Sequence, residues 1–321
     1  TCIHEWVDLK LSTLNESGQK KWLTSYTKYF LEKLGFILIR VETSGQGHLV
    51  FKSLNSTGQK LTQGELIKSM LFYLALKHPS LGIEDKWEKM ITNLEEIRFG
   101  AEDIVTNFWS IYAKSRNLVK GNKNLAKKIE EQFYSLDEDD LSEELKTMVA
   151  ESKMLKRIII PPDSAKWTGV SRKNDLIDLR LNDFTQVRPL LLSARAVCDD
   201  SKFDQVIKIV MTVVARVFMP TTTNPNKLSD KWREWAKQLR DEGESFVNTL
   251  KTEVNDYMFE IYNVTTQKKL DEAFCKELLN WSMTNDQAKH YLRIVGTLDG
   301  NPYSDYAKAK IQAEHVFPKG A

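Results

Sequence analysis

The sequence predicts a mainly α-helical protein with a small α/β segment near its beginning and a short strand near its end. Apolar residues recur at helical spacing through most of the chain, as in Trp22, Tyr26 and Tyr29. A β-type run occurs at 36–41, directly after Gly35. Pro161-Pro162 then interrupts the helical pattern, and proline cannot continue a helix. We therefore expect a multi-helix body with a boundary between two helical subdomains at this point.

Length and charge limit the class of protein. A chain of 321 residues exceeds what a single hydrophobic core usually holds, so two or three subdomains are expected. The 46 basic and 44 acidic residues leave a formal charge of +2, which does not indicate a nucleic-acid binder as a whole. Any basic surface for DNA must therefore be local.

Cysteine usage and hydropathy indicate a cytoplasmic protein that does not enter a membrane. The three cysteines, Cys2, Cys198 and Cys275, are far apart and form neither a disulfide framework nor a metal-binding pair. The most apolar run, 206–219, contains Lys208 and Arg216 and is too short to span a bilayer.

The segment 50–72 combines a polar turn with the start of a helix. The turn is Asn55-Ser56-Thr57-Gly58, and Thr62-Gln63-Gly64-Glu65 follows as a capping box. In such a box the Thr hydroxyl and the Glu carboxylate satisfy free amides at the helix start. The apolar residues that recur behind it are Leu66, Ile67, Met70, Leu71 and Leu74. The residues alone predict a turn docked between two packed helices.

The order of residues in this segment also resembles a known family. Its members share the pattern F-x-x-L-N-x-x-G-x-x-L-S/T-x-x-D/E-L-I-K-N, and the chain matches it at Phe51, Leu54-Asn55, Gly58, Leu61-Thr62 and Leu66-Ile67-Lys68. The pattern is similar to that of GmrSD-like proteins, which are bacterial and archaeal restriction proteins acting on modified DNA. In that family a nucleotide-hydrolysing domain precedes a helical region and a C-terminal HNH-like nuclease. Ser69 stands where the family has Asn.

The resemblance implies a nucleotide site in the first part of the chain. Asn55, Gly58 and Lys60 are the residues that could contact a nucleoside triphosphate. The family's Asp-Gly-Gln-Gln-Arg signature does not occur in this sequence. We expect the chain, which begins with Thr1, to start inside a longer polypeptide and after that signature. This argues against nucleotide hydrolysis by this chain.

The end of the chain resembles the opening strand of the family's nuclease, which reads I-x-x-E/D-H-I-x-P. The corresponding residues are Ile311, Glu314, His315 and Pro318. The resemblance makes His315 the base that activates water and Glu314 an acid that helps hold a divalent cation such as magnesium. Six residues follow His315, which leaves no room for the second half of a metal site. We therefore expect no nuclease activity from this chain by itself.

These observations divide the chain into four parts. Residues 1–80 are the C-terminal part of a nucleotide-binding domain, 81–160 and 161–308 are two helical subdomains, and 309–321 begin a truncated HNH-like nuclease. The function implied is that of a helical region linking the two domains of a DNA restriction endonuclease in anti-phage defence. DNA is the expected partner of the longer protein, and association between copies of the chain stays open.

A basic cluster in the helical middle is the candidate DNA contact. Its lysines are Lys120, Lys123, Lys127 and Lys128, grouped around Gly121-Asn122. Such side chains neutralise backbone phosphates without reading bases. The alternative interpretation is a solvated helix face.

A second hypothesis for the whole chain is a helical protein-interaction scaffold without nucleic-acid activity, which the balanced charge supports. A third is a nucleotide-binding module that uses Asn55, Gly58 and Lys60.

Overall fold

The protein is mainly α-helical, as the sequence predicts. A computed structural model describes residues 2–33, 35, 61–97, 103–162, 169–181, 183–218, 225–281 and 288. All regular structure in these ranges is helical. The expected β-type run at 36–41 and the expected strand within 309–321 lie outside the described residues.

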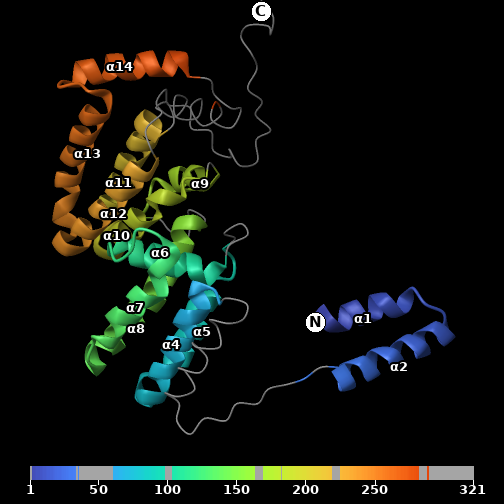
Figure 1. The fold of residues 1–321 in the computed structure, drawn as a ribbon. Helices are drawn as coiled ribbons and strands as arrows, with labels where there is room; N and C mark the ends of the chain where they lie inside the picture. Colours follow the sequence, from blue (N-terminus) through green and yellow to red (C-terminus); the bar gives the residue numbers. More distant parts are fainter. Residues whose placement is uncertain are drawn as a thin grey trace, which may run out of the picture. The chain divides into compact units, whose positions relative to one another are not determined.

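The α-helices are labelled in chain order in Figure 1. They are α1 (Cys2–Ser12), α2 (Glu16–Lys33), α4 (Gln63–Lys77), α5 (Ile83–Leu94), α6 (Ile104–Ser115), α7 (Leu125–Tyr134), α8 (Glu138–Ile159), α9 (Lys173–Leu181), α10 (Arg188–Val197), α11 (Asp200–Val213), α12 (Pro225–Glu242), α13 (Phe246–Tyr262) and α14 (Gln267–Asn280). Short 3-10 turns precede α5, α7, α10 and α13, and a π-helical turn, Val214–Phe218, follows α11.

The chain forms two compact units, Thr1–Gly47 and His48–Ala321. In the first unit α1 and α2 make a helical hairpin, and Gln19 closes it by donating from Nε2 to the carbonyl oxygen of Leu11 at 2.9 Å. The aromatic rings of Trp6, Trp22 and Tyr26 pack together along the hairpin, with Trp22 and Tyr26 stacked at 4.9 Å. None of the side chains of α2 is buried. Two helices alone are too few to cover these rings.

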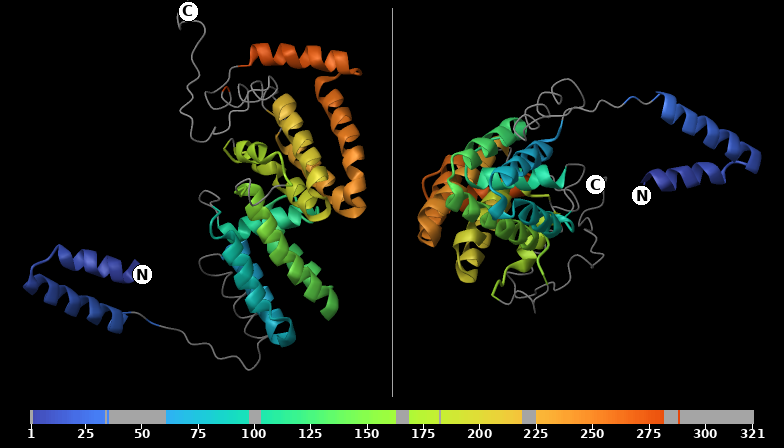
Figure 2. Two further views of the ribbon diagram at one scale, coloured as in Figure 1. Left: turned by 180° about the vertical axis from the view of Figure 1, so that it is seen from behind. Right: turned by 90° about the horizontal axis from the view of Figure 1, so that it is seen from below.

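The second unit has three groups of helices, which can be followed in Figure 2. Helices α4, α5, α7 and α8 pack at one end, and α11, α13 and α14 pack at the other. Helices α6, α10 and α12 lie between them, where α10 packs against α6, α8 and α12. Pro161-Pro162 follows α8, and one hydrophobic cluster contains buried residues from both sides of this pair. Helices before and after the prolines therefore share a core.

The capping box at the start of α4 is confirmed. Thr62 Oγ1 accepts from the backbone N–H of Glu65 at 3.2 Å, and Glu65 Oε2 accepts from the N–H of Thr62 at 2.7 Å. The apolar face predicted behind it is also present, since Ile67 and Leu71 are 0% exposed. The segment therefore begins a helix that is fixed at its first turn and buried along one face.

The amphipathic segment 228–250 does not form one continuous helix. Helix α12 ends at Glu242, a 3-10 turn covers Gly243–Ser245, and α13 begins at Phe246. Gly243 has a φ of 70°, in the left-handed region that glycine adopts without a steric penalty. This turn lets α13 pack back against α12, where Trp235 Nε1 donates to Glu253 Oε2 at 2.8 Å.

Gly64 fixes the distance between α4 and α6. Its backbone N–H donates to Thr106 Oγ1 at 2.9 Å. A Cβ placed on Gly64 would lie 2.6 Å from Asp103 Oδ2 and 3.0 Å from the backbone nitrogen of Thr106. The two helices can approach this closely only because the residue at this point has no side chain.

Replacing Gly64 by Ala should therefore lower the free energy of unfolding by about 1–3 kcal/mol, the usual cost of overpacking. Urea denaturation measures the change. Gly121→Ala is the control, because a Cβ there meets nothing within 4 Å and should change stability by less than about 0.5 kcal/mol. Equal effects of the two substitutions would mean that the α4–α6 contact can relax around a methyl group.

Candidate nucleic-acid interface

The structure describes only part of the site predicted from the sequence. The nucleotide-contacting residues Asn55, Gly58 and Lys60, and the nuclease residues Glu314 and His315, lie outside the described residues. The four lysines of the basic cluster lie within the described residues.

The lysine cluster at the start of α7 is partly neutralised by acids of the same helix. Lys127 and Lys128 both approach Glu131, with Nζ to carboxylate distances of 3.9 and 2.7 Å. The hydrogen bond from Lys128 lowers the pKa of the Glu131 carboxyl below its usual value. Lys120 and Lys123 are exposed in the segment before α7. The four residues therefore lie close in sequence without forming one uncompensated basic surface.

Two of these lysines line a groove between α4 and α7. Its volume is about 410 Å³. Lys123 and Lys127 share the groove with Glu130 and Glu131, and its apolar wall includes Met70. The two acids balance the two lysines, so the groove offers little net attraction to a phosphate.

A different groove, between α5 and α8, contains more positive charge. Its volume is about 770 Å³. Lys86 and Lys89 come from α5, and Lys146 and Lys153 come from α8. The remaining lining residues are Asp85, Glu88, Thr92, Asn93, Val149 and Ala150. This set is not recognisable in the sequence, because its two halves are more than fifty residues apart. The sequence shows that Lys86 and Lys89 are three residues apart and that Lys146 and Lys153 are seven apart. It does not show that α5 packs against α8.

The walls of this α5–α8 groove are joined by hydrogen bonds. Asn93 Nδ2 on α5 donates to Ser152 Oγ at 2.8 Å and to the carbonyl oxygen of Val149 at 3.3 Å on α8. Beyond the end of α5, Lys156 Nζ pairs with Glu96 Oε1 at 2.9 Å. These contacts hold the two rows of lysines at a fixed separation.

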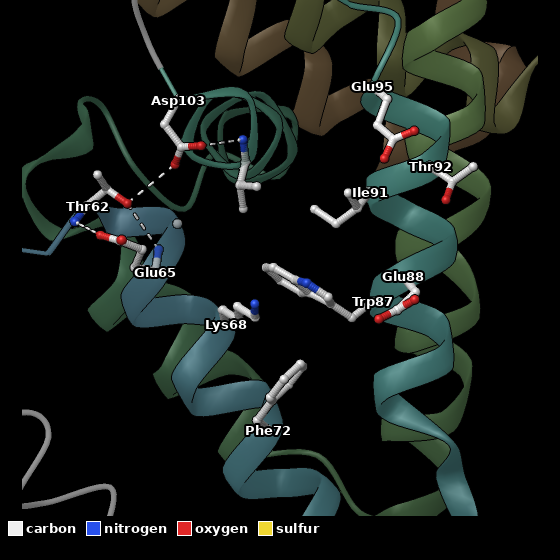
Figure 3. A pocket seen from close by; sticks show the side chains of 12 residues that line it. Thr62, Glu65, Lys68, Phe72, Trp87, Glu88, Ile91, Thr92, Glu95 and Asp103 are labelled. Atoms are coloured by element: carbon white, nitrogen blue, oxygen red, sulfur yellow. Dashed lines mark hydrogen bonds between the residues drawn. The ribbon is translucent and has the colours of Figure 1, made fainter. Parts of the chain in front are cut away.

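A third groove lies between α4 and α5 and has the opposite charge (Figure 3). Its volume is about 790 Å³. Trp87 and Phe72 form an edge-to-face pair at 6.2 Å, and Lys68 Nζ lies 5.3 Å from the centre of the Phe72 ring. The carboxylates around this single lysine are Glu65, Glu88, Glu95 and Asp103. Their excess makes the groove repulsive to phosphate.

A buried ionic network lies where α6, α8, α10 and α12 meet. Glu151 is 1% exposed and accepts hydrogen bonds from two arginines. Arg116, the C-cap residue of α6, donates from Nη1 and Nη2 to the two carboxylate oxygens of Glu151 at 3.0 and 3.1 Å. Arg240 on α12 donates from Nη1 to Oε1 at 2.8 Å. A buried carboxylate is tolerated only with such partners, because removing a charge from water is costly.

Two serines complete the coordination of Arg240. Its Nε donates to Ser193 Oγ on α10, and its Nη2 donates to Ser115 Oγ on α6, both at 3.0 Å. Ser193 in turn donates to the carbonyl oxygen of Ser115 at 3.2 Å. These charged groups are bound to protein atoms on all four helices, so the network supports the fold and does not present a reactive group to a substrate.

Tyr112 extends the network toward α7. Its hydroxyl donates to Glu144 Oε1, which also accepts from Gln132 Nε2 at 3.1 Å. The Arg116 guanidinium lies 3.5 Å from the centre of the Tyr112 ring. Complete burial raises the pKa of the Tyr112 hydroxyl well above its usual value of 10, although the charge of Arg116 opposes this shift.

The part of the chain that the structure describes contains no group of three or more His, Cys, Asp or Glu residues placed to hold a metal ion. The cation expected at Glu314 and His315 concerns residues outside that part. None of the described helices is long and apolar enough to cross a membrane.

Comparison of the chain with models of protein families, with curated proteins and with solved structures finds no match.

Replacing Glu151 by Gln should lower the free energy of unfolding by about 3–5 kcal/mol, because it removes the only carboxylate that binds Arg240 and leaves Arg116 with only the longer pair to Glu144 at 3.7 Å among the described residues. Chemical denaturation at pH 7 measures the loss. The matched control is Glu143→Gln, which breaks an exposed pair with Lys146 at 3.1 Å and should cost less than about 1 kcal/mol. A loss below 1 kcal/mol for Glu151→Gln would show that the network does not hold the helices together.

Tyr112 should make the protein sensitive to alkali. Its pKa is higher in the folded state than in the unfolded state, so only the unfolded chain releases the proton once the pH passes about 10. The contribution of Tyr112 to the free energy of unfolding is therefore fully present below pH 10. It is lost as the pH rises toward the pKa of the folded state. In Tyr112→Phe, the decline of unfolding free energy with pH between 10 and 12 should be shallower by about 1.4 kcal/mol per pH unit. An unchanged slope would contradict the assignment.

Proposed function

We propose that the described helical body is the connecting region of a DNA restriction endonuclease, lying between a nucleotide-hydrolysing domain and an HNH-like nuclease. The observation that carries the proposal is the start of α4. The second half of the family-like block, from Leu61-Thr62 to Lys68, begins a capped helix whose Gly64 is hydrogen-bonded to Thr106 of α6. A segment that joins one domain to the next needs an anchored end of this kind.

The contacts that join the helices of the body support the same proposal. A connecting region must hold its two ends at a fixed separation if one domain is to influence the other. Glu151 binds arginines that come from before and after Pro161-Pro162, which ties the two predicted helical subdomains to each other. Burial of Trp109 and Trp232 in the same cluster adds an apolar contribution.

The roles predicted for the two ends stay part of the proposal. His315 would activate water and Glu314 would help hold a divalent cation such as magnesium. Asn55, Gly58 and Lys60 would contact a nucleoside triphosphate. The connecting region itself would contact DNA through exposed lysines.

The alternative proposal is a protein-interaction scaffold, and the hairpin of the first unit favours it. Trp6, Tyr29 and Leu31 expose 48, 63 and 75% of their surface. Exposed apolar side chains grouped on one element are typical of protein-binding surfaces. The two proposals differ in whether the chain binds DNA.

The purified chain should bind a labelled DNA duplex at 50 mM salt, with the affinity falling at least about tenfold by 200 mM, as expected for two or more phosphate contacts. Fluorescence anisotropy over a salt series measures this dependence. A folded chain that does not bind duplex DNA at 50 mM salt would contradict the proposal and favour the scaffold.

A further inference from the structure

We propose that the α5–α8 groove is the surface that binds the phosphate backbone of duplex DNA. This inference rests on the proposed function and names the site of its DNA contact. It also moves the contact away from Lys120, Lys123, Lys127 and Lys128, the lysines that the sequence indicates.

Two of the groove lysines have no ionic partner among the described residues. Among the described residues, no carboxylate pairs with Lys89 or Lys153, and both are exposed. The other two lysines already have partners and are less available to bind a phosphate. Lys146 pairs with the exposed Glu143 at 3.1 Å, and Lys86 donates to the carbonyl oxygen of Leu81. Lys89 and Lys153 therefore contribute the available charge.

The acids around the groove do not fully balance its four lysines. Asp85 and Glu88 are the two carboxylates in the lining, and Glu143, outside the lining, pairs with Lys146. Asp85 lies in the first turn of α5, where a negative charge is stabilised by the helix dipole. Glu88 also borders the neighbouring α4–α5 groove. With Glu143 counted, the α5–α8 groove has four lysines against three carboxylates and a small positive formal charge, whereas acids balance or outnumber lysines in the other two grooves.

The spacing of the lysines allows contacts with separate phosphates. Lys146 and Lys153 are seven residues apart on α8, which is two turns and about 10.5 Å along the helix axis. This distance equals the rise of about three base pairs of duplex DNA. Lys89 faces the groove from the opposite wall. Asn93 joins the two helices, so the backbone positions of the lysines are set before a duplex binds.

The composition of the lining favours a duplex that is bound without sequence preference. Single strands are bound mainly by stacking of bases on aromatic rings, and no aromatic residue lines this groove in the described structure. Lysine contacts phosphate as a point charge and does not read base edges. Asn93, the amide side chain in the groove, already donates to α8.

The test compares three double variants by anisotropy with a labelled duplex over a salt series. Lys89→Gln/Lys153→Gln should lower affinity at 50 mM salt about tenfold and should make the slope of log affinity against log salt shallower by about 1.8. The matched control is Lys227→Gln/Lys251→Gln, which removes two exposed lysines of α12 and α13 outside the groove and should change affinity less than about twofold. The third variant is Lys120→Gln/Lys123→Gln. Thermal unfolding checks that all three are folded.

The outcomes separate this inference from the proposed function. If the wild-type chain does not bind the duplex, the proposed function fails and the groove assignment fails with it. If the wild type binds but the groove and control variants lose equal affinity, or only the Lys120/Lys123 variant loses it, the groove assignment alone is wrong. Labelled poly-glutamate is the final probe. If it binds as tightly as the duplex and is weakened equally by the groove variant, the occupant is an acidic protein segment and the proposal is overturned.

Discussion

The larger unit depends on one buried carboxylate that accepts hydrogen bonds from two arginines. Glu151 binds Arg116 through both of its oxygens and Arg240 through one of them, so three helices contribute a charged group to one point. The apolar contacts around it would tolerate some sliding of the helices, because hydrophobic burial is not directional. The hydrogen bonds do not, because they fix both distance and angle. Such a network specifies one arrangement among the packings that the same apolar faces could adopt.

Local features of the fold could be predicted from the sequence, and features that depend on helix pairing could not. The capping box at Thr62 and Glu65 was predictable because all its atoms lie within four residues. The break at Gly243 was missed, since one glycine in an apolar-periodic segment does not reveal that its φ is positive. The Glu151 network was also missed, because its arginines are separated from it by 35 and 89 residues.

The lysines illustrate the same distinction in the candidate site. The sequence indicates a basic cluster at Lys120, Lys123, Lys127 and Lys128 because these lysines are close together along the chain. Glu131, however, lies one helical turn from two of them and pairs with both. Lys89 and Lys153 are isolated in sequence and come together only because α5 packs against α8. In a chain with nearly equal numbers of acids and bases, the sign of a surface is set by which helix faces meet. A count of charges along the sequence does not contain that information.

The glycine turn between α12 and α13 prevents these two helices from forming one long continuous helix. A continuous helix over the same 38 residues, Pro225 to Tyr262, would be a rod about 57 Å long. Much of such a rod would project into solvent and carry Trp235 and Tyr257 with it. Because the chain reverses at Gly243, these two rings meet edge to face at 5.8 Å instead. The turn at Gly243 thus gives two shorter helices that pack against each other in place of one extended helix.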